Sequence, residues 1–262
     1  MPPETDRTVS AGDIQAVDRV GQILRLFSAE QTTMTVTEVA EQLGLNRSTT
    51  HRYFTSLVAA GLLERGRKPS RYEPGGLLVQ LGAAALGRRQ VLDIAAPYLR
   101  QVCHDSHLTT VMSLWGYSGP VVSRVEEDNT RSVLVTVRVG AQLELHSAQA
   151  KVFLAFLPDQ LRVDRLLATL PETERDTLRH QLDDTRHTGI ATDHLTDTGI
   201  TALATGVFDE HGICATIALV GTARTLPVDS PGSHQQDLLN TAAEISARMG
   251  HTPPNADLHA AG

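Results

Sequence analysis

The sequence has little of what membrane, secreted and disulfide-stabilised proteins need. Its apolar stretches all fall short of the roughly 18 uninterrupted residues that a membrane-spanning helix requires. Its first residues, MPPETDRTVSAGD, are polar and lack the basic-then-apolar pattern of a secretory signal. Only two cysteines occur, Cys103 and Cys214, too few for a disulfide framework, so we expect reduced thiols in the core. These features predict a cytoplasmic protein with no membrane partner.

The sequence also lacks the usual signatures of enzymes and cofactor sites. It contains no glycine-rich phosphate loop, no nucleophile elbow and no HExxH zinc motif. His104 and His107 lie one helical turn apart, but a metal site needs further ligands, and a polar helix end is the favoured interpretation. Asp183 and Asp184 are adjacent, so their side chains diverge on a helix and do not form an acid–base pair. We expect no metal and no cofactor, and an enzyme is the least favoured class.

The net charge of −7 hides an uneven distribution of charge. Between residues 46 and 71 the only acid is Glu64, whereas the bases are Arg47, Arg52, Arg65, Arg67, Lys68 and Arg71. A basic segment on an acidic chain suits a protein with one face that meets nucleic-acid phosphate. A solvated charged surface has the same composition, so the helical context has to decide between the two.

Apolar residues at helical spacing predict three short helices near the N-terminus. The first covers about residues 14–28. Thr35 and Glu38 form a capping box that opens the second helix, and Gly44 allows it to stop sharply. Asn46 is a good N-cap for the third helix. The second and third helices, joined by a tight turn, have the pattern of a helix-turn-helix.

A short basic hairpin is predicted directly after the third helix. Residues 62–65 and 71–73 have the pattern of two strands, and the turn between them is Gly66-Arg67-Lys68-Pro69-Ser70. A helix-turn-helix followed by such a hairpin is a winged helix, which binds double-stranded DNA.

The outer face of the third helix predicts which residues contact an operator. The first residues of a recognition helix enter the major groove, so Arg47, Ser48, Thr49 and Arg52 are the candidates for base contact. Support of the helix start is the alternative role for Ser48 and Thr49. His51 is expected to contact phosphate or to be structural. The cations of the hairpin are expected to bind phosphate, and so to set affinity rather than sequence preference: Arg65, Arg67, Lys68 and Arg71.

The rest of the chain predicts an α+β domain with a largely antiparallel sheet. In chain order we expect a disordered tail over 1–12, the winged helix over 13–74 and a linker helix over 75–92. The α+β domain follows over 93–250, and a second tail covers 251–262. The expected strands cover 108–116, 120–128, 131–140, 200–208 and 213–220. The expected helices of this domain cover 93–107, 143–157, 163–170, 174–187 and 233–249.

Six segments, in this order, resemble the IclR family of bacterial regulators over residues 14–249: QAVDRVGQILRLF, TVTEVAEQLGLNRSTTHRYFTSLVAAGLLER, RYEPGGLLVQLG, LHSAQAKVFLAFLP, GIATD and GVFDEHGICATIALVG. The resemblance implies a GAF-like effector domain and a homodimer or homotetramer formed largely through the DNA-binding and linker regions. It also implies a palindromic operator and a small organic metabolite that modulates repression or activation.

The resemblance also implies where an effector binds. In the family, backbone amides of the loop that matches His146–Ala150 hold small acids, so Ala148 and Gln149 are the candidates here. An aspartate that matches Asp193 also binds the acid. Side chains on two later strands complete the site, and the matching residues here are Ala202, Ala218 and Val220. For Asp193 a turn or cap is the alternative role. Arg131 and Arg138 could meet a carboxylate, but solvent-facing positions are favoured for both.

This sequence departs from the family pattern in the same region. The loop before Lys151 is one residue shorter than usual, and Ala150 replaces the glycine that the family has there. Strand positions that often hold cysteine or serine hold alanine or valine. An apolar lining favours a larger or more apolar effector, such as an aromatic acid, over a two- or three-carbon keto acid. The alternative is a regulator whose C-terminal domain serves assembly and binds no effector.

Overall fold

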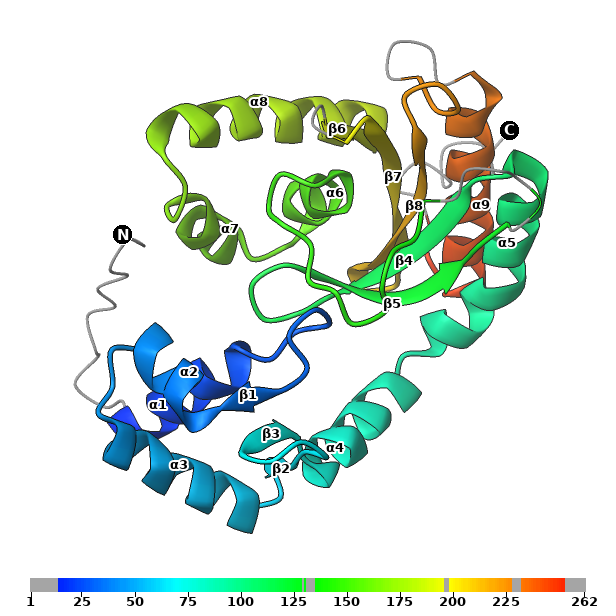
Figure 1. Ribbon diagram of the computed structural model, residues 1–262. Helices are drawn as coiled ribbons and strands as arrows, with labels where there is room; N and C mark the ends of the chain where they lie inside the picture. Colours follow the sequence, from blue (N-terminus) through cyan, green and yellow to red (C-terminus); the bar gives the residue numbers. More distant parts are fainter. Residues whose placement is uncertain (1–13, 129, 131–134, 196–197, 228–231, 253–262) are drawn as a thin grey trace, which may run out of the picture. The chain divides into compact units, whose positions relative to one another are not determined.

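The computed structural model in Figure 1 describes residues 14–128, 130, 135–195, 198–227 and 232–252. The chain divides into two compact units, Met1–Arg88 and Arg89–Gly262. The tail predicted over 1–12, and residues 253–262 of the other tail, lie outside the described residues. The single linker helix predicted over 75–92 is wrong in detail, because helix α4 (Gly76–Gly87) ends in the first unit and helix α5 (Gln90–Ser106) begins in the second.

The first unit is a winged helix. In chain order its elements are α1 (Gln15–Arg25), β1 (Met34–Thr35), α2 (Val36–Gln42), α3 (Arg47–Ala59), β2 (Leu63–Arg65), β3 (Arg71–Pro74) and α4. The three predicted helices and the hairpin are confirmed. The sheet has the order β1-β3-β2 and is antiparallel. The two-residue strand β1, too short for a sequence pattern, was not predicted.

Local signals explain the helix boundaries of the first unit. The side chain of Thr35 accepts a hydrogen bond from the backbone N–H of Glu38 at 3.2 Å, and the Glu38 carboxylate accepts one from the Thr35 N–H at 2.7 Å. This is the predicted capping box. Gly44 has φ +63°, which glycine adopts without strain. Asn46 accepts a hydrogen bond from the Ser48 N–H at 2.9 Å and so caps α3.

A small apolar core fixes which face of α3 points outward. Phe54 is fully buried among Ile23, Met34 and Leu63, and its ring meets the ring of Tyr72 edge-on at a centroid distance of 4.7 Å. Such edge-to-face pairs add to the stabilisation that burial alone gives. Because the inner face of α3 is held by this core, its opposite face is presented to solvent.

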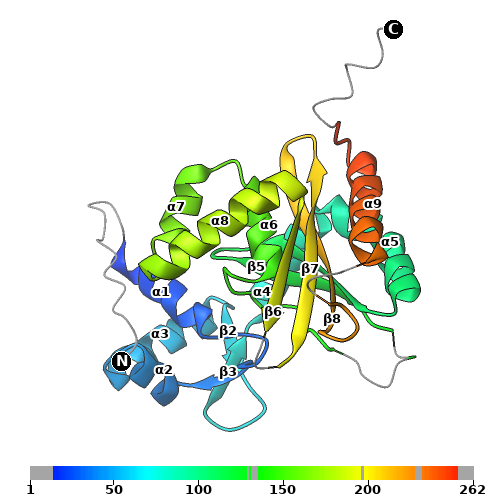
Figure 2. The same ribbon diagram turned by 90° about the horizontal axis from the view of Figure 1, so that it is seen from above.

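The second unit is built on one five-stranded antiparallel sheet, which confirms the predicted α+β class. The strand order is β5-β4-β8-β7-β6, with β4 (Thr109–Trp115), β5 (Pro120–Glu126), β6 (Ile190–Leu195), β7 (Ile200–Asp209) and β8 (Gly212–Thr222). Helices α5 and α9 (Ser233–Arg248) cover one face. Helix α6 (Ala148–Phe156) covers the other, with α8 (Glu172–Thr188) beside it and α7 (Gln160–Leu167) nearby (Figures 1 and 2).

Strand β8 shows how the sequence divides the two faces of this sheet. Ile217 and Leu219 pack in the core that α5 and α9 form with the sheet. Ala218, between them, points to the opposite face, where it packs against Ala148 of α6. Because alanines line this face, α6 lies close to the sheet. Strand β6, which was not predicted, extends the sheet beyond β7.

The strand predicted over 131–140 is wrong for its described part, because residues 135–140 form no strand. Residues 131–134 lie outside the described residues, and 135–139 are irregular. Val135 and Val137 still pack on the sheet, so the apolar alternation reflects side-chain packing and not a ladder. The backbone carbonyls of Val122 and Pro120 in β5 accept hydrogen bonds from the N–H groups of Gly140 and Leu143. Because this segment pairs with β5, the next helix begins later in the sequence than predicted. That helix, predicted from 143, begins at Ala148 after its cap Ser147.

Candidate DNA-binding and effector-binding sites

The outer face of α3 gathers all five helix residues predicted to meet DNA. Each of them is exposed: Arg47, Ser48, Thr49, His51 and Arg52. The hydroxyl of Ser48 donates to Asn46 Oδ1 at 2.8 Å, so Ser48 supports the helix start in this structure. The other four side chains are free to approach a groove, and the face is polar and basic.

The wing, residues 63–74, presents three further cations. Arg65, Arg67 and Lys68 are exposed, and Arg67 and Lys68 make no ion pair with any described residue. The Arg65 guanidinium lies 5.9 Å from the centroid of the Tyr72 ring, a cation–π contact that limits its freedom. The wing tip therefore carries the positive charge that phosphate binding needs.

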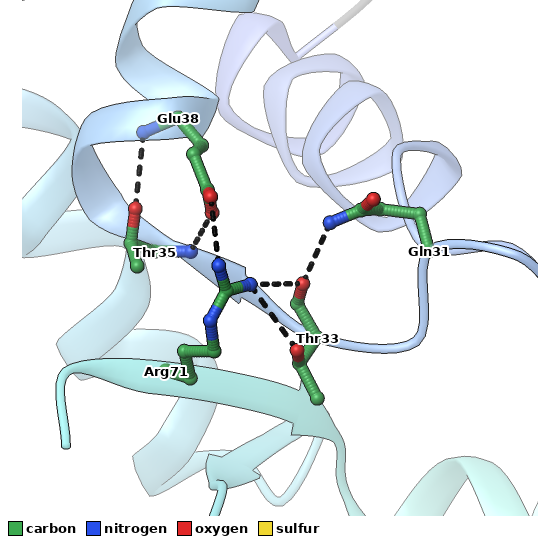
Figure 3. A network of polar contacts seen from close by, with 5 residues as sticks. All are labelled: Gln31, Thr33, Thr35, Glu38 and Arg71. Carbon is green, nitrogen blue, oxygen red and sulfur yellow. Dashed lines mark hydrogen bonds and ion pairs between the residues drawn. The ribbon is translucent and has the colours of Figure 1, made fainter. Parts of the chain in front are cut away.

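Arg71 begins strand β3, as predicted, but its side chain bonds to other residues of the first unit. Its guanidinium donates through Nη1 to the Thr33 carbonyl at 2.9 Å and to the Thr33 hydroxyl at 3.2 Å, and through Nη2 to Glu38 Oε1 at 3.0 Å (Figure 3). The hydrogen bonds from Thr35, and then the charge of Arg71, hold the pKa of the Glu38 carboxyl below its ordinary value. Three hydrogen bonds from Arg71 are therefore made inside the unit, and the expectation that Arg71 contacts phosphate stays a prediction.

The predicted effector residues come together on the α6 face of the sheet. Residues paired across antiparallel strands point to the same face. Asp193 pairs with Ala202, and Ala202 pairs with Val220, so these three form one row across β6, β7 and β8. Ala218 and Ala148 lie in the apolar cluster beside this row. The lining is small and aliphatic, with one carboxylate at its edge.

Asp193 lies inside strand β6, so its alternative role as a turn or cap is wrong. The ammonium of the neighbouring Lys151 donates to the Thr192 carbonyl at 2.9 Å and holds α6 against this edge strand. Burial lowers the pKa of Lys151, and the charge of Asp193 opposes that shift. The charge of Asp193 therefore offsets part of the cost of burying the Lys151 ammonium.

Gln149 has a structural role that the sequence did not indicate. Its side-chain oxygen accepts a hydrogen bond from the Ser113 hydroxyl at 3.0 Å, and its Nε2 donates to Val111 O and to Thr216 O, each at 3.3 Å. The residue is only 4% exposed. This amide therefore fastens the first turn of α6 to β4 and β8, and only its backbone remains for an effector.

Two of the remaining polar candidates, His104 and His107, pair with carboxylates. His107 Nδ1 lies 2.5 Å from a carboxylate oxygen of Asp128, and this hydrogen bond lowers the pKa of Asp128 to about 2. His104 pairs with Asp105 at 3.1 Å. Arg138 is exposed, whereas Arg131 lies outside the described residues.

The part of the chain that the structure describes has neither a metal-binding cluster nor a membrane-spanning helix. It holds no group of three or more histidine, cysteine or acidic side chains placed to bind a metal ion. None of the helices in the same part is long and apolar enough to span a membrane.

Comparison with known proteins agrees with this architecture over most of the chain. The family model described as the IclR helix-turn-helix domain matches residues 16–67, and the model described as the bacterial transcriptional regulator IclR C-terminal matches residues 83–247. The transcriptional repressor IclR of Escherichia coli K12 is 26% identical over 262 residues, covering 95% of this chain and 94% of its own.

Solved structures agree with the fold. A transcriptional regulator of the IclR type from Silicibacter sp. TM1040 is 20% identical and matches with a TM-score of 0.78, over 91% of this chain and 98% of its own. An IclR homologue from Microbacterium hydrocarbonoxydans, complexed with 4-hydroxybenzoate, is 21% identical, with a TM-score of 0.69 over 89% and 98% of the two chains. The curated relatives are regulators of transcription, in agreement with the prediction that this chain is not an enzyme. The chain belongs to the IclR family of bacterial, DNA-binding transcriptional regulators.

Proposed function

We propose that this protein is a ligand-responsive regulator that acts in the cytoplasm, binds a palindromic operator and changes its DNA affinity when a small organic molecule binds the second unit. The observation that carries the proposal is the outer face of α3, where Arg47, Thr49, His51 and Arg52 are all exposed beside a basic wing. A recognition helix reads base edges, and a basic hairpin supplies phosphate contacts.

A second copy of the chain is the proposed partner of α4 and α1. Every residue of α4 is described, and none of them is buried. Val79, Leu81 and Leu86 are 69%, 55% and 47% exposed, and on α1 Val17 is 66% exposed. Apolar helices in water favour association. A dimer with twofold symmetry would present two copies of α3 to the two halves of a palindrome, and a tetramer is two such dimers.

The proposed effector is an apolar or aromatic acid. The row Asp193, Ala202 and Val220 and the neighbouring Ala218 offer apolar surface and few polar partners. A small keto acid would leave its polar groups unpaired against such a lining. The complex of the Microbacterium homologue indicates that this fold can hold 4-hydroxybenzoate, an aromatic acid of the proposed class.

The DNA-binding part is tested by a pair of variants. Arg52→Ala is expected to relax preference at one base position in a selection from a random duplex library, because a bidentate guanine contact is lost. Arg67→Ala is expected to weaken all duplexes alike and to lower the slope of log affinity against log salt by about 0.9, the value for one phosphate contact. Equal losses on selected and random DNA for both variants would contradict this division of roles.

The effector part is tested by thermal stabilisation of the purified protein. A ligand that binds only the native state raises the melting temperature by mass action. We expect 4-hydroxybenzoate and related aromatic acids to raise it in a dose-dependent way, and pyruvate and glyoxylate to have no effect. Stabilisation by the keto acids alone would contradict the proposed ligand class. If no small acid stabilised the protein, a second unit that serves assembly would be the better assignment.

A further inference from the structure

We propose that Arg71 and Glu38 form a latch that positions the wing for DNA, so that both are positioning residues and neither contacts the nucleic acid. The latch consists of Thr33, Thr35, Glu38 and Arg71 (Figure 3). It joins β3, the strand that returns from the wing tip, to the segment that leads into α2. The proposal rests on the proposed phosphate contacts of the wing.

The backbone alone ties the wing weakly to the rest of the unit. Strand β1 has two residues, and only two residue pairs, Met34 with Tyr72 and Thr35 with Arg71, join it to β3. The Arg71 side chain adds three hydrogen bonds at the same place, two to Thr33 and one to Glu38. The Arg71 side chain therefore adds hydrogen bonds at the point where only two residue pairs join β1 to β3.

The two oxygens of Glu38 have separate roles in the latch. Oε2 accepts from the Thr35 backbone N–H at 2.7 Å and caps α2, whereas Oε1 accepts from Arg71 at 3.0 Å. One carboxylate thus fixes the start of α2 and the base of the wing to each other. The Arg71 and Glu38 side chains are 29% and 36% exposed, so the pair is partly shielded from water. Arg67 and Lys68 lie only a few residues before Arg71 and depend on this base for their position.

The sign of one substitution separates a latch from simple charge effects. Glu38→Gln keeps a capping residue at this position, because glutamine also serves in a capping box, but it removes the charge that holds Arg71. Removal of an acid near DNA by itself raises affinity. We expect the opposite: affinity for a random-sequence duplex falls roughly three- to tenfold, as loss of one partly exposed hydrogen bond predicts. The matched control is Glu41→Gln on the same helix, whose exposed side chain bonds to no described residue.

The experiment measures the affinity of the full chain for this duplex over a series of salt concentrations, at a temperature at which circular dichroism shows every variant folded. Glu38→Gln and Arg71→Gln are expected to lower affinity with an unchanged salt slope, and Glu41→Gln is expected not to lower it. An increase for Glu38→Gln, or a slope for Arg71→Gln reduced by about 0.9, would overturn the proposal. If Arg67→Ala also left the slope unchanged, the proposed phosphate contact of the wing would fail with it. A reduced slope for Arg67→Ala, with full affinity for Glu38→Gln, would refute the latch alone.

Discussion

Replacement of Phe54 by alanine is expected to unfold the first unit while the second stays folded. Phe54 is fully buried at the centre of the small core that α3 shares with α1 and the wing. Substitution of a buried phenylalanine by alanine costs about 3–5 kcal/mol, since apolar contacts are lost and a cavity remains. A unit of this size has little more stability than that to lose. DNA binding is therefore expected to be lost as well, and differential scanning calorimetry should show the loss or downward shift of one transition.

The matched control is Phe153→Ala in α6, since Phe153 is 1% exposed and packs edge-on against Trp115. It is expected to lower the transition of the second unit and to leave the first in place. Two variants that shifted both transitions together would show that the two units unfold as one, and would contradict the division at Arg88. A Phe54→Ala protein that bound DNA with full affinity would show that this core does not hold α3.

Most of the winged helix could be predicted from the sequence because local signals determine it. The capping box of Thr35 and Glu38, the glycine at 44 and the cap Asn46 act over a few residues, and the structure has each of them in the predicted role. The outward face of α3 followed from the apolar spacing of its other face. Such signals need no knowledge of the rest of the chain.

The functional details that the sequence did not indicate depend on contacts between distant residues. Arg71 meets Glu38 across 33 positions, and Gln149 meets Ser113 across 36. An arginine on a basic hairpin has the same sequence context whether it faces phosphate or an internal carboxylate. The valines of 131–140 alternate in the sequence as in a strand, but Val135 and Val137 pack on the sheet without forming one. Neither amino-acid composition nor the spacing of apolar residues distinguishes the two alternatives in either example.

Replacement of Gly75 by alanine is expected to separate α4 from the end of α3 and to lower both stability and DNA affinity. An added Cβ at Gly75 would lie 2.4 Å from the carbonyl oxygen of Gly61, closer than a real side chain comes to backbone. Two hydrogen bonds hold the junction, Gly75 N–H to Leu62 O at 2.9 Å and Leu77 N–H to Gly61 O at 3.1 Å. Forcing these backbones apart is expected to cost about 2–3 kcal/mol, measured as a fall in denaturation midpoint.

The neighbouring glycine provides the control that makes this result specific. Gly75 has φ −83°, a value that alanine adopts freely, so the expected loss comes from the contact and not from the backbone angle. At Gly76 an added Cβ would have no described atom within 4 Å, and the residue is the first of α4. Gly76→Ala is therefore expected to stabilise the unit by up to about 1 kcal/mol, since alanine favours the helix. Opposite signs at adjacent positions would mean that the close approach of Gly61 and Gly75 holds α4 to the end of α3. The same sign at both would mean that helix propensity alone governs this junction.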